Sequence, residues 1–204
     1  MSESKQVSPF VFFQGWLSTW VPIVTALISL VISLYTFAVA TQAPEVRLIM
    51  PDVVRIAQGG ESGPYVYLQP IFVNTGQSER VEVVTSVQLR VEPVDPPGGG
   101  VDFVWDEQGT WLFDPNTQSL NWIFTADPGA FLVSANNARD FTGLFIGPKE
   151  WRFAPGVYRI HVIAQRVTAR APLAASIEVE LAQADIEYLD EAQGSRFLTF
   201  PARP

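Results

Sequence analysis

The 204-residue sequence contains no cysteine and a single histidine, His161. The absence of cysteine excludes a disulfide framework, a thiolate metal site and a cysteine nucleophile. One histidine cannot build a histidine-rich metal site, and any Ser-His-Asp triad would have to use it. Alternation places His161 on the polar face of its predicted strand, together with Arg159 and Gln165. A histidine exposed on a sheet is therefore the simplest interpretation.

Basic residues are also scarce. Thirteen lysines and arginines stand against 21 acids, which gives a formal net charge of −8, and no basic run occurs. An acidic chain of this kind is not expected to bind nucleic acid, and P-loop, dinucleotide and zinc patterns are missing. Asp102 and Asp106 share a predicted strand face and remain an acid–base alternative, although solvated acids are the simpler interpretation. We assign no catalytic, cofactor-binding or metal-binding residue and predict that the protein is not an enzyme.

Charge is entirely absent from residues 6–44. Within this stretch, residues 21–40 supply the roughly 20 apolar residues that an α-helix needs to cross a bilayer. Trp16 and Trp20 at one end and Tyr35 toward the other suit the two membrane interfaces. We predict a tail over 1–15, a transmembrane helix over 16–41, a linker over 42–44 and a β domain over 45–204.

One side of the predicted helix carries small and hydroxyl side chains. At about 100° per residue, seven of them fall within an arc of roughly 80° that holds no large apolar residue: Ser18, Pro22, Thr25, Ser29, Ser33, Thr36 and Ala40. Such a stripe lets a second helix approach closely and offers interhelical hydrogen bonds. In the alternative, the hydroxyls bond back to carbonyls of their own helix in a lone span. We favour packing against other transmembrane helices, in a homo-oligomer or a membrane complex.

The end of the apolar stretch leaves two processing outcomes open. Ala38, Val39 and Ala40 match a signal-peptide cleavage pattern, but the apolar run exceeds a typical h-region of about 7–15 residues. We therefore expect an uncleaved anchor in the lipid bilayer. The few bases near the span faintly favour a cytoplasmic β domain, yet long domains translocate largely regardless of such charges. Short-tailed single-pass proteins with a β domain resemble bacterial signal-anchored proteins that face outward, so we expect an extracytoplasmic β domain.

The remaining chain consists of short alternating segments and Pro/Gly turns. It predicts strands over 45–50 and 53–56, broken at Pro51. It also predicts one strand over 65–73 that is apolar on both faces, in which Pro70 implies an edge or a bulge. The clearest strand points Val81, Val83, Val87, Leu89 and Val91 inward and Glu82, Ser86, Gln88, Arg90 and Glu92 outward. Residues 136–143 indicate a loop. After a strand over 177–181, the apolar phase shifts to Ile186 and Tyr188, which predicts a bulge or a break.

Two segments resemble bacterial immunoglobulin-like and fibronectin-like sandwiches: IFVNTGQSERVEVVTSVQLRVEP over 71–93 and FAPGVYRIHVIAQ over 153–165. In such domains an Asn-x-Gly turn joins two core strands, and Pro-Gly-x-Tyr opens a late strand near a tyrosine corner. The resemblance implies an all-β, immunoglobulin-like antiparallel sandwich after the single transmembrane helix. The immunoglobulin cysteine pair is absent, and a resemblance at the level of fold brings no catalytic residues.

Aromatic residues are dense between residues 103 and 153. Their tryptophans could form a platform for sugar rings or a partner protein, although large aromatics also fill sandwich cores. Trp111 and Trp151 lie next to predicted turns and are our candidates for ligand or partner contact. We predict a non-enzymatic accessory or structural subunit of a membrane protein complex. The alternative is a cell-surface module that recognises a protein or carbohydrate ligand through the loops and aromatics of 103–151.

Overall fold

The computed structural model describes residues 9–59, 62–76, 80–168, 171–192 and 196–203. The chain divides into two compact units, Met1–Gln42 and Ala43–Pro204. The first eight residues of the predicted tail lie outside the described residues.

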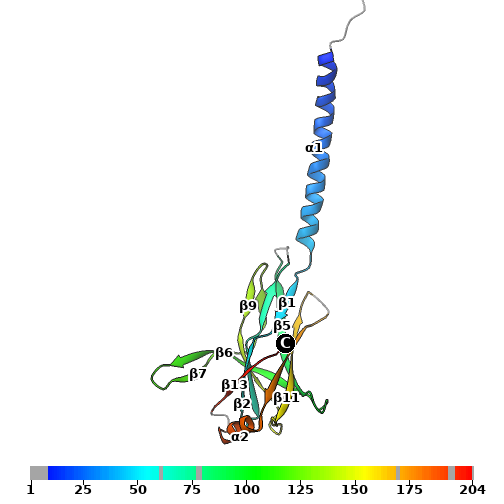
Figure 1. Ribbon diagram of the computed structural model, residues 1–204. Coiled ribbons are helices and arrows are strands. Elements are labelled where there is room, and N and C mark those ends of the chain that lie inside the picture. The colour runs from blue at the N-terminus through cyan, green and yellow to red at the C-terminus, as the bar shows by residue number, and fades with distance from the viewer. Residues whose placement is uncertain (1–8, 60–61, 77–79, 169–170, 193–195, 204) are drawn as a thin grey trace, which may run out of the picture. The chain divides into compact units, whose positions relative to one another are not determined.

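The first unit contains helix α1, Pro9–Thr41 (Figure 1). It begins at Pro9 rather than at residue 16, and proline is well suited to a first helical position because its missing N–H has no partner there anyway. The segment Trp20–Thr41 is long and apolar enough to cross a membrane. Among the described residues, one helix, near the N-terminus, meets the requirement for a span by length and composition.

The second unit is built mostly from antiparallel strands. A small sheet has the order β1–β4–β9, and a larger one has the order β12–β11–β5–β6–β10–β3–β2–β13, with β7 added to β6 and β8 to β5. The small sheet comprises β1 Val46–Ile49, β4 Ile71–Asn74 and β9 Ala138–Asp140. The larger one comprises β2 Val53–Gln58, β3 Pro64–Leu68, β5 Glu82–Pro93, β6 Val101–Asp114, β7 Ser119–Ala126, β8 Phe131–Val133, β10 Thr142–Ile146, β11 Gly156–Arg166, β12 Leu173–Leu181 and β13 Leu198–Pro201.

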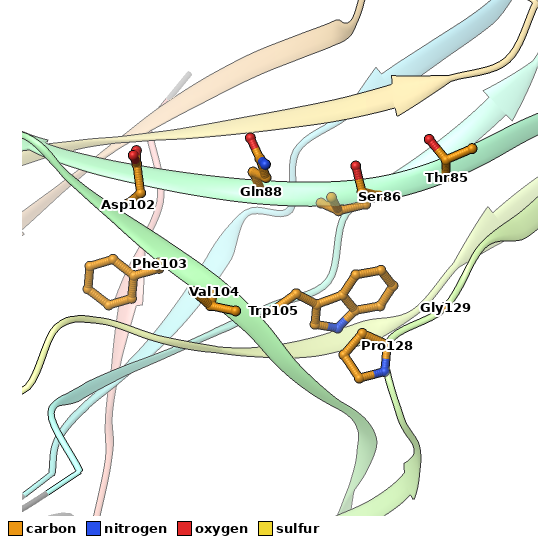
Figure 2. A pocket seen from close by; sticks show the side chains of 10 residues that line it. Thr85, Ser86, Gln88, Asp102, Phe103, Val104, Trp105, Pro128 and Gly129 are labelled. Carbon is orange, nitrogen blue, oxygen red and sulfur yellow. The ribbon is translucent and has the colours of Figure 1, made fainter.

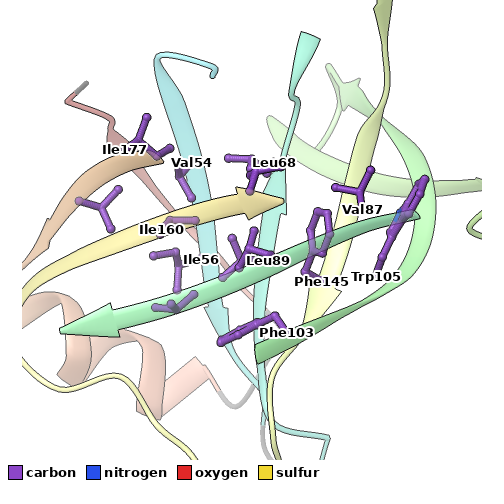
Figure 3. Packing of buried hydrophobic residues seen from close by; sticks show 14 of the residues in the cluster. Val54, Ile56, Leu68, Val87, Leu89, Phe103, Trp105, Phe145, Ile160 and Ile177 are labelled. Atoms are coloured by element: carbon purple, nitrogen blue, oxygen red, sulfur yellow. The ribbon is translucent and has the colours of Figure 1, made fainter. Parts of the chain in front are cut away.

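Side chains from both sheets share one core. Phe72 of the small sheet and Leu89, Phe103, Phe145 and Ile160 of the larger one are at most 1% exposed. Figure 3 shows how the side chains from β5, β6, β10 and β11 converge. Fully burying a side chain of this size stabilises the fold by about 1.5–3 kcal/mol relative to leaving it exposed. The prediction of a mostly β domain after one apolar helix is confirmed.

Two prolines divide apolar runs between the sheets. The break predicted at Pro51 separates β1 from β2. The single strand predicted over 65–73 is wrong, because it is divided at Pro70 into β3 and β4, which belong to different sheets. Proline has no N–H to donate to a ladder, so it ends one strand and lets the chain change sheets.

The start of β5 also differs from the prediction. Glu82 and Val84 are buried and Val81 is 40% exposed, the reverse of the predicted alternation. Opposite this point, Arg166 faces Val84 while Gln165 faces Ser86, so Thr85 is an extra residue that reverses the phase. The Glu82 carboxylate is satisfied inside the domain, because it accepts hydrogen bonds from the backbone of Val83 and Thr168.

The predicted break after β12 is a helix, α2, Gln183–Ala192. Ile186 and Leu189 are buried three residues apart, which is the spacing of a helix and not of a strand. The Asp185 carboxylate accepts a 2.8 Å hydrogen bond from the Ala182 N–H and caps the helix start. The predicted loop over 136–143 is also wrong, since β9 pairs there with β4 and β10 begins at Thr142.

Candidate functional site

Strands β6 and β7 form a long hairpin that extends past the neighbouring strand β10. β10 pairs with β6 as far as Gly109, whereas β7 continues the pairing to Asp114. Figure 1 shows this hairpin projecting away from the other strands of the second unit. At its turn, Asp114 accepts a 2.8 Å hydrogen bond from the Asn116 N–H, and this bond lowers the pKa of the Asp114 carboxyl. The local Asp turn therefore holds the tip in shape.

One face of the hairpin is apolar along its whole length. Cross-strand pairs place six residues on it: Gly109 with Phe124, Trp111 with Trp122, and Phe113 with Leu120. Phe113 and Phe124 are 57% and 52% exposed. The opposite face carries Leu112 and Ile123, which are 58% and 43% exposed. Such a concentration of exposed large apolar side chains is uncommon on a surface that stays in water.

The charges that the hairpin segment itself carries are all negative. No lysine or arginine occurs between Arg90 and Arg139, and β7 contains no charged residue at all. The ionisable acids nearby are Asp102, Asp106, Glu107, Asp114 and Asp127. The hairpin segment is therefore acidic, whereas Arg55 and Arg196, from elsewhere in the chain, lie beside its Trp111 and Trp122 face.

An aromatic cluster fastens the hairpin to the sheet. The Trp111 ring centroid lies 4.9 Å from that of Tyr67 on β3 and 4.6 Å from that of Phe197, and the Arg55 guanidinium lies 4.9 Å above the Trp111 ring. Edge-to-face rings and a cation over a ring each add to simple burial. Burial, with Tyr65 and Glu107 adding to it, raises the pKa of Tyr67 to about 12, and burial lowers the pKa of Arg55.

Gly109 allows this cluster to close. A Cβ at this position would lie 2.4 Å from Cζ2 of Trp122 and 2.6 Å from the backbone oxygen of Ile123. The Trp122 ring therefore packs directly on the glycine backbone, and its Nε1 donates a 2.9 Å hydrogen bond to the Glu107 carboxylate.

A hollow of about 210 Å³ opens beside the cluster, lined in part by Tyr67, Trp111, Trp122, Asn121 and Arg196. Ring faces next to a guanidinium donor suit a sugar, whose ring stacks while its hydroxyls accept hydrogen bonds. Nε1 of Trp111 and Nε of Arg55 are buried and have no hydrogen-bond partner among the described residues.

The two predicted contact residues belong to separate ring clusters. Trp111 joins the hairpin cluster described above. Trp151 is half-buried and packs against Phe103, Phe153 and Tyr158, with ring centroids 5.6, 4.6 and 6.0 Å away. The Tyr158 hydroxyl in turn donates to the Ala154 carbonyl at 3.0 Å, which is the hydrogen bond of a tyrosine corner.

The predicted helix-packing residues Ser18, Thr25, Ser29, Ser33 and Thr36 are all exposed on α1. Thr25, Ser33 and Thr36 each donate a 2.8 Å hydrogen bond to the carbonyl four residues earlier. These bonds satisfy the hydroxyl hydrogens within the helix and leave oxygen lone pairs that can accept from a neighbour. Packing against another helix stays a prediction.

A second hollow, of about 340 Å³, lies between β5, β6 and residues 128–129. Figure 2 shows Thr85, Ser86 and Gln88 lining it together with Asp102. Asp102 is the one carboxylate in this lining, and Arg90 pairs with it at 3.0 Å.

His161 is half-buried and hydrogen-bonded to Glu92 at 2.8 Å. Within the described residues, no group of three or more His, Asp or Glu could hold a metal ion.

Sequence reasoning missed most of the hairpin surface. It singled out Trp111 but not Phe113, Phe124, Leu112 or Ile123. The available signal was the uncharged segment SLNWIFTA over 119–126, in which apolar residues occupy both faces instead of one.

No family model and no curated protein matches the chain. Among solved structures, it is similar to Spo0M, a sporulation control protein from Bacillus subtilis, with 11% identity and a TM-score of 0.36 over 74% of this chain. It is also similar to a family 123 glycoside hydrolase from Clostridium perfringens, with 8% identity and a TM-score of 0.38 over 69% of this chain. The chain spans 54% of the first protein and 28% of the second. Likenesses this distant bring neither an activity nor a fold family to the chain.

Proposed function

We propose that the protein is a non-enzymatic, membrane-anchored accessory subunit whose β domain docks onto another protein chain through the β6–β7 hairpin. The carrying observation is the exposure of Phe113 and Phe124 on one hairpin face and of Leu112 and Ile123 on the other. Aromatic side chains in such positions are typical of residues that dominate binding energy. The acids of the hairpin segment, such as Asp114 at its tip, favour a partner surface that carries bases.

The rest of the chain fits this role. α1 supports an uncleaved single-pass anchor, with the stripe from Ser18 to Thr36 packed on other helices and the β domain outside a bacterial cell membrane. The hydrogen bond between Tyr158 and Ala154 supports an immunoglobulin-like sandwich as the relative of this domain.

The test is native mass spectrometry of the full chain extracted from its own membranes in mild detergent. We expect partner subunits to copurify and to be lost when Phe113 and Phe124 are both changed to serine. Leu132→Ser is the matched control, since Leu132 is 60% exposed on β8, away from the hairpin. Retention of every subunit by the double variant would overturn the proposal.

A ligand-binding module is the second candidate, favoured by the hollow beside Tyr67, Trp111 and Trp122. Arg196 lines this hollow and offers guanidinium donors to a carbohydrate. Titration of neutral and acidic oligosaccharides, followed by tryptophan fluorescence, tests it. Arg196→Ala should weaken binding without unfolding the domain, and no response to any oligosaccharide would remove this candidate.

A further inference from the structure

The outer edge of β7 is unpaired. Among the described residues β7 pairs with β6 alone, so the N–H and C=O groups on its other side have no ladder partner. A row of such groups is a template for a further strand.

The other strands at the ends of ladders in this domain are protected. β1 carries Arg47, β9 carries Arg139 and β13 ends at Pro201. β8, which pairs with β5 alone, is only three residues long, and so short an edge offers little to a further strand. The backbone of Glu178 on β12 is bonded to Arg203 in both directions, at 2.8 and 3.0 Å. Charges, prolines and covering segments are the usual means of blocking an edge. β7 has eight residues with neither a charge nor a proline, so it is the edge that lacks protection.

We propose that β7 pairs antiparallel with β7 of a second copy, so that two hairpins form one continuous sheet. This inference rests on the proposed function, because the second copy takes the β7 edge of the hairpin and leaves the face with Phe113 and Phe124 to the other partner chain. A two-fold axis perpendicular to the sheet keeps the Trp122 face of one copy beside the Trp122 face of the other. With the axis at Trp122, Leu120 of one copy lies opposite Phe124 of the other on both sides of the axis, so these apolar side chains become cross-strand neighbours.

The charges permit this pairing. With the axis near Trp122, the nearest acids across it are Asp127 of one copy and Asp114 of the other. Strand spacing of about 4.8 Å and a rise of about 3.4 Å per residue put them about 12 Å apart. That distance exceeds the Debye length of about 8 Å at physiological ionic strength, so their repulsion is screened. Two hairpins bury less surface area than a standard interface of about 1,600 Å². Anchoring both copies in one membrane raises their effective concentration, which compensates for so small a contact.

The test uses the absence of cysteine. Single cysteines are placed at each position of β7 in the full chain, in membranes, and are oxidised with copper phenanthroline. The residue on the axis faces itself at about 5 Å between Cα atoms, which suits a disulfide, whereas a neighbour one residue away is separated by about 8 Å. We therefore expect disulfide-linked dimer to peak at one position among 121, 122 and 123, by roughly five-fold over positions two residues away.

Leu132→Cys on β8 gives the background. If the yield of disulfide-linked dimer is the same at every β7 position and equals the Leu132→Cys background, the pairing is overturned. Because Trp122→Cys removes a ring from the cluster, native mass spectrometry of Asn121→Pro supplies a second readout: loss of dimer supports the pairing, and unchanged dimer overturns it. If the profile is flat while the double serine variant still loses other subunits, the proposed function stands and self-pairing fails. If the profile peaks and no other subunit copurifies, self-pairing stands and the accessory role fails.

Discussion

Trp111 and Trp122 meet across the β6–β7 hairpin with ring centroids 5.2 Å apart and ring planes at 62°. Trp122 is hydrogen-bonded to Glu107 of the same hairpin. Trp111 contacts Arg55 and Tyr67, which lie outside the hairpin. This pair therefore fixes the base of the hairpin on β2 and β3 and leaves Phe113 and Phe124 exposed. A rigid support beneath exposed aromatics is what a docking surface needs.

Trp111→Ala should release Tyr67. The ring of Trp111 contributes to the burial that raises the pKa of Tyr67 to about 12, so its removal should return that pKa toward the ordinary value of about 10. The measurement is a titration of tyrosinate absorbance in the full-length protein.

Tyr67→Phe identifies the signal among the five tyrosines. Trp151→Ala is the control, because the ring contacts of Trp151 are with Phe103, Phe153 and Tyr158 and not with Tyr67. A Trp111→Ala protein in which Tyr67 still titrates near pH 12 would contradict the packing of the hairpin on β3.

Gly109→Ala should destabilise the hairpin. The new Cβ would meet the Trp122 ring at 2.4 Å and a backbone oxygen at 2.6 Å, and a backbone atom cannot move aside cheaply. Overpacking of this kind costs about 1–3 kcal/mol in the free energy of unfolding. Gly129→Ala is the matched control, since a Cβ there has no atom within 4 Å. Urea unfolding followed by tryptophan fluorescence should separate the two variants, and equal stability would show that Trp122 does not pack on Gly109.

Parts of this architecture follow from local sequence and parts do not. The span was predictable because residues 6–44 lack charge, and the β5 alternation from Val87 onward follows from a period of two. The bulge at Thr85 was not predictable from local sequence, because it depends on the pairing of β5 with β11, which lies far along the chain. α2 was missed because Ile186 and Tyr188 fit a strand while Ile186 and Leu189 fit a helix, and only packing decides between them.

The candidate site was likewise only partly predictable from the sequence. The uncharged sequence of β7 and the apolar residues on both hairpin faces are visible in the sequence. The cover over Trp111 comes from Arg55, Tyr67 and Phe197, which are distant in the chain, so local pattern cannot distinguish the covered tryptophan from the exposed phenylalanines. Trp151 has a similar local setting next to a turn and yet packs against the core.

Stability should depend on Glu92 in acid. The hydrogen bond from His161 is the main reason that the pKa of Glu92 is lowered from 4.5 in the folded protein. A lowered folded pKa means that the ionised carboxylate stabilises the fold above pH 4.5 and that this contribution is lost as the pH falls through the folded value. Glu92→Gln should therefore flatten the fall in melting temperature below pH 4.5. Glu150→Gln, at an exposed site, is the control, and parallel curves for wild type and Glu92→Gln would refute the linkage.

Replacing Ser29 and Ser33 by leucine should disperse the assembly without unfolding α1. Among the described residues, the Ser33 hydroxyl bonds to the carbonyl of Ser29 within its own helix. Leucine is at least as good a helix former as serine, so the isolated span tolerates both changes. A partner helix packed on this stripe would instead meet two large side chains where close approach is required. Val31→Leu, outside the stripe, controls for added bulk. Native mass spectrometry should show fewer copurifying subunits for the double leucine variant alone. Identical assembly in all three proteins would mean that the hydroxyls serve a lone span, and that any complex is held by the hairpin.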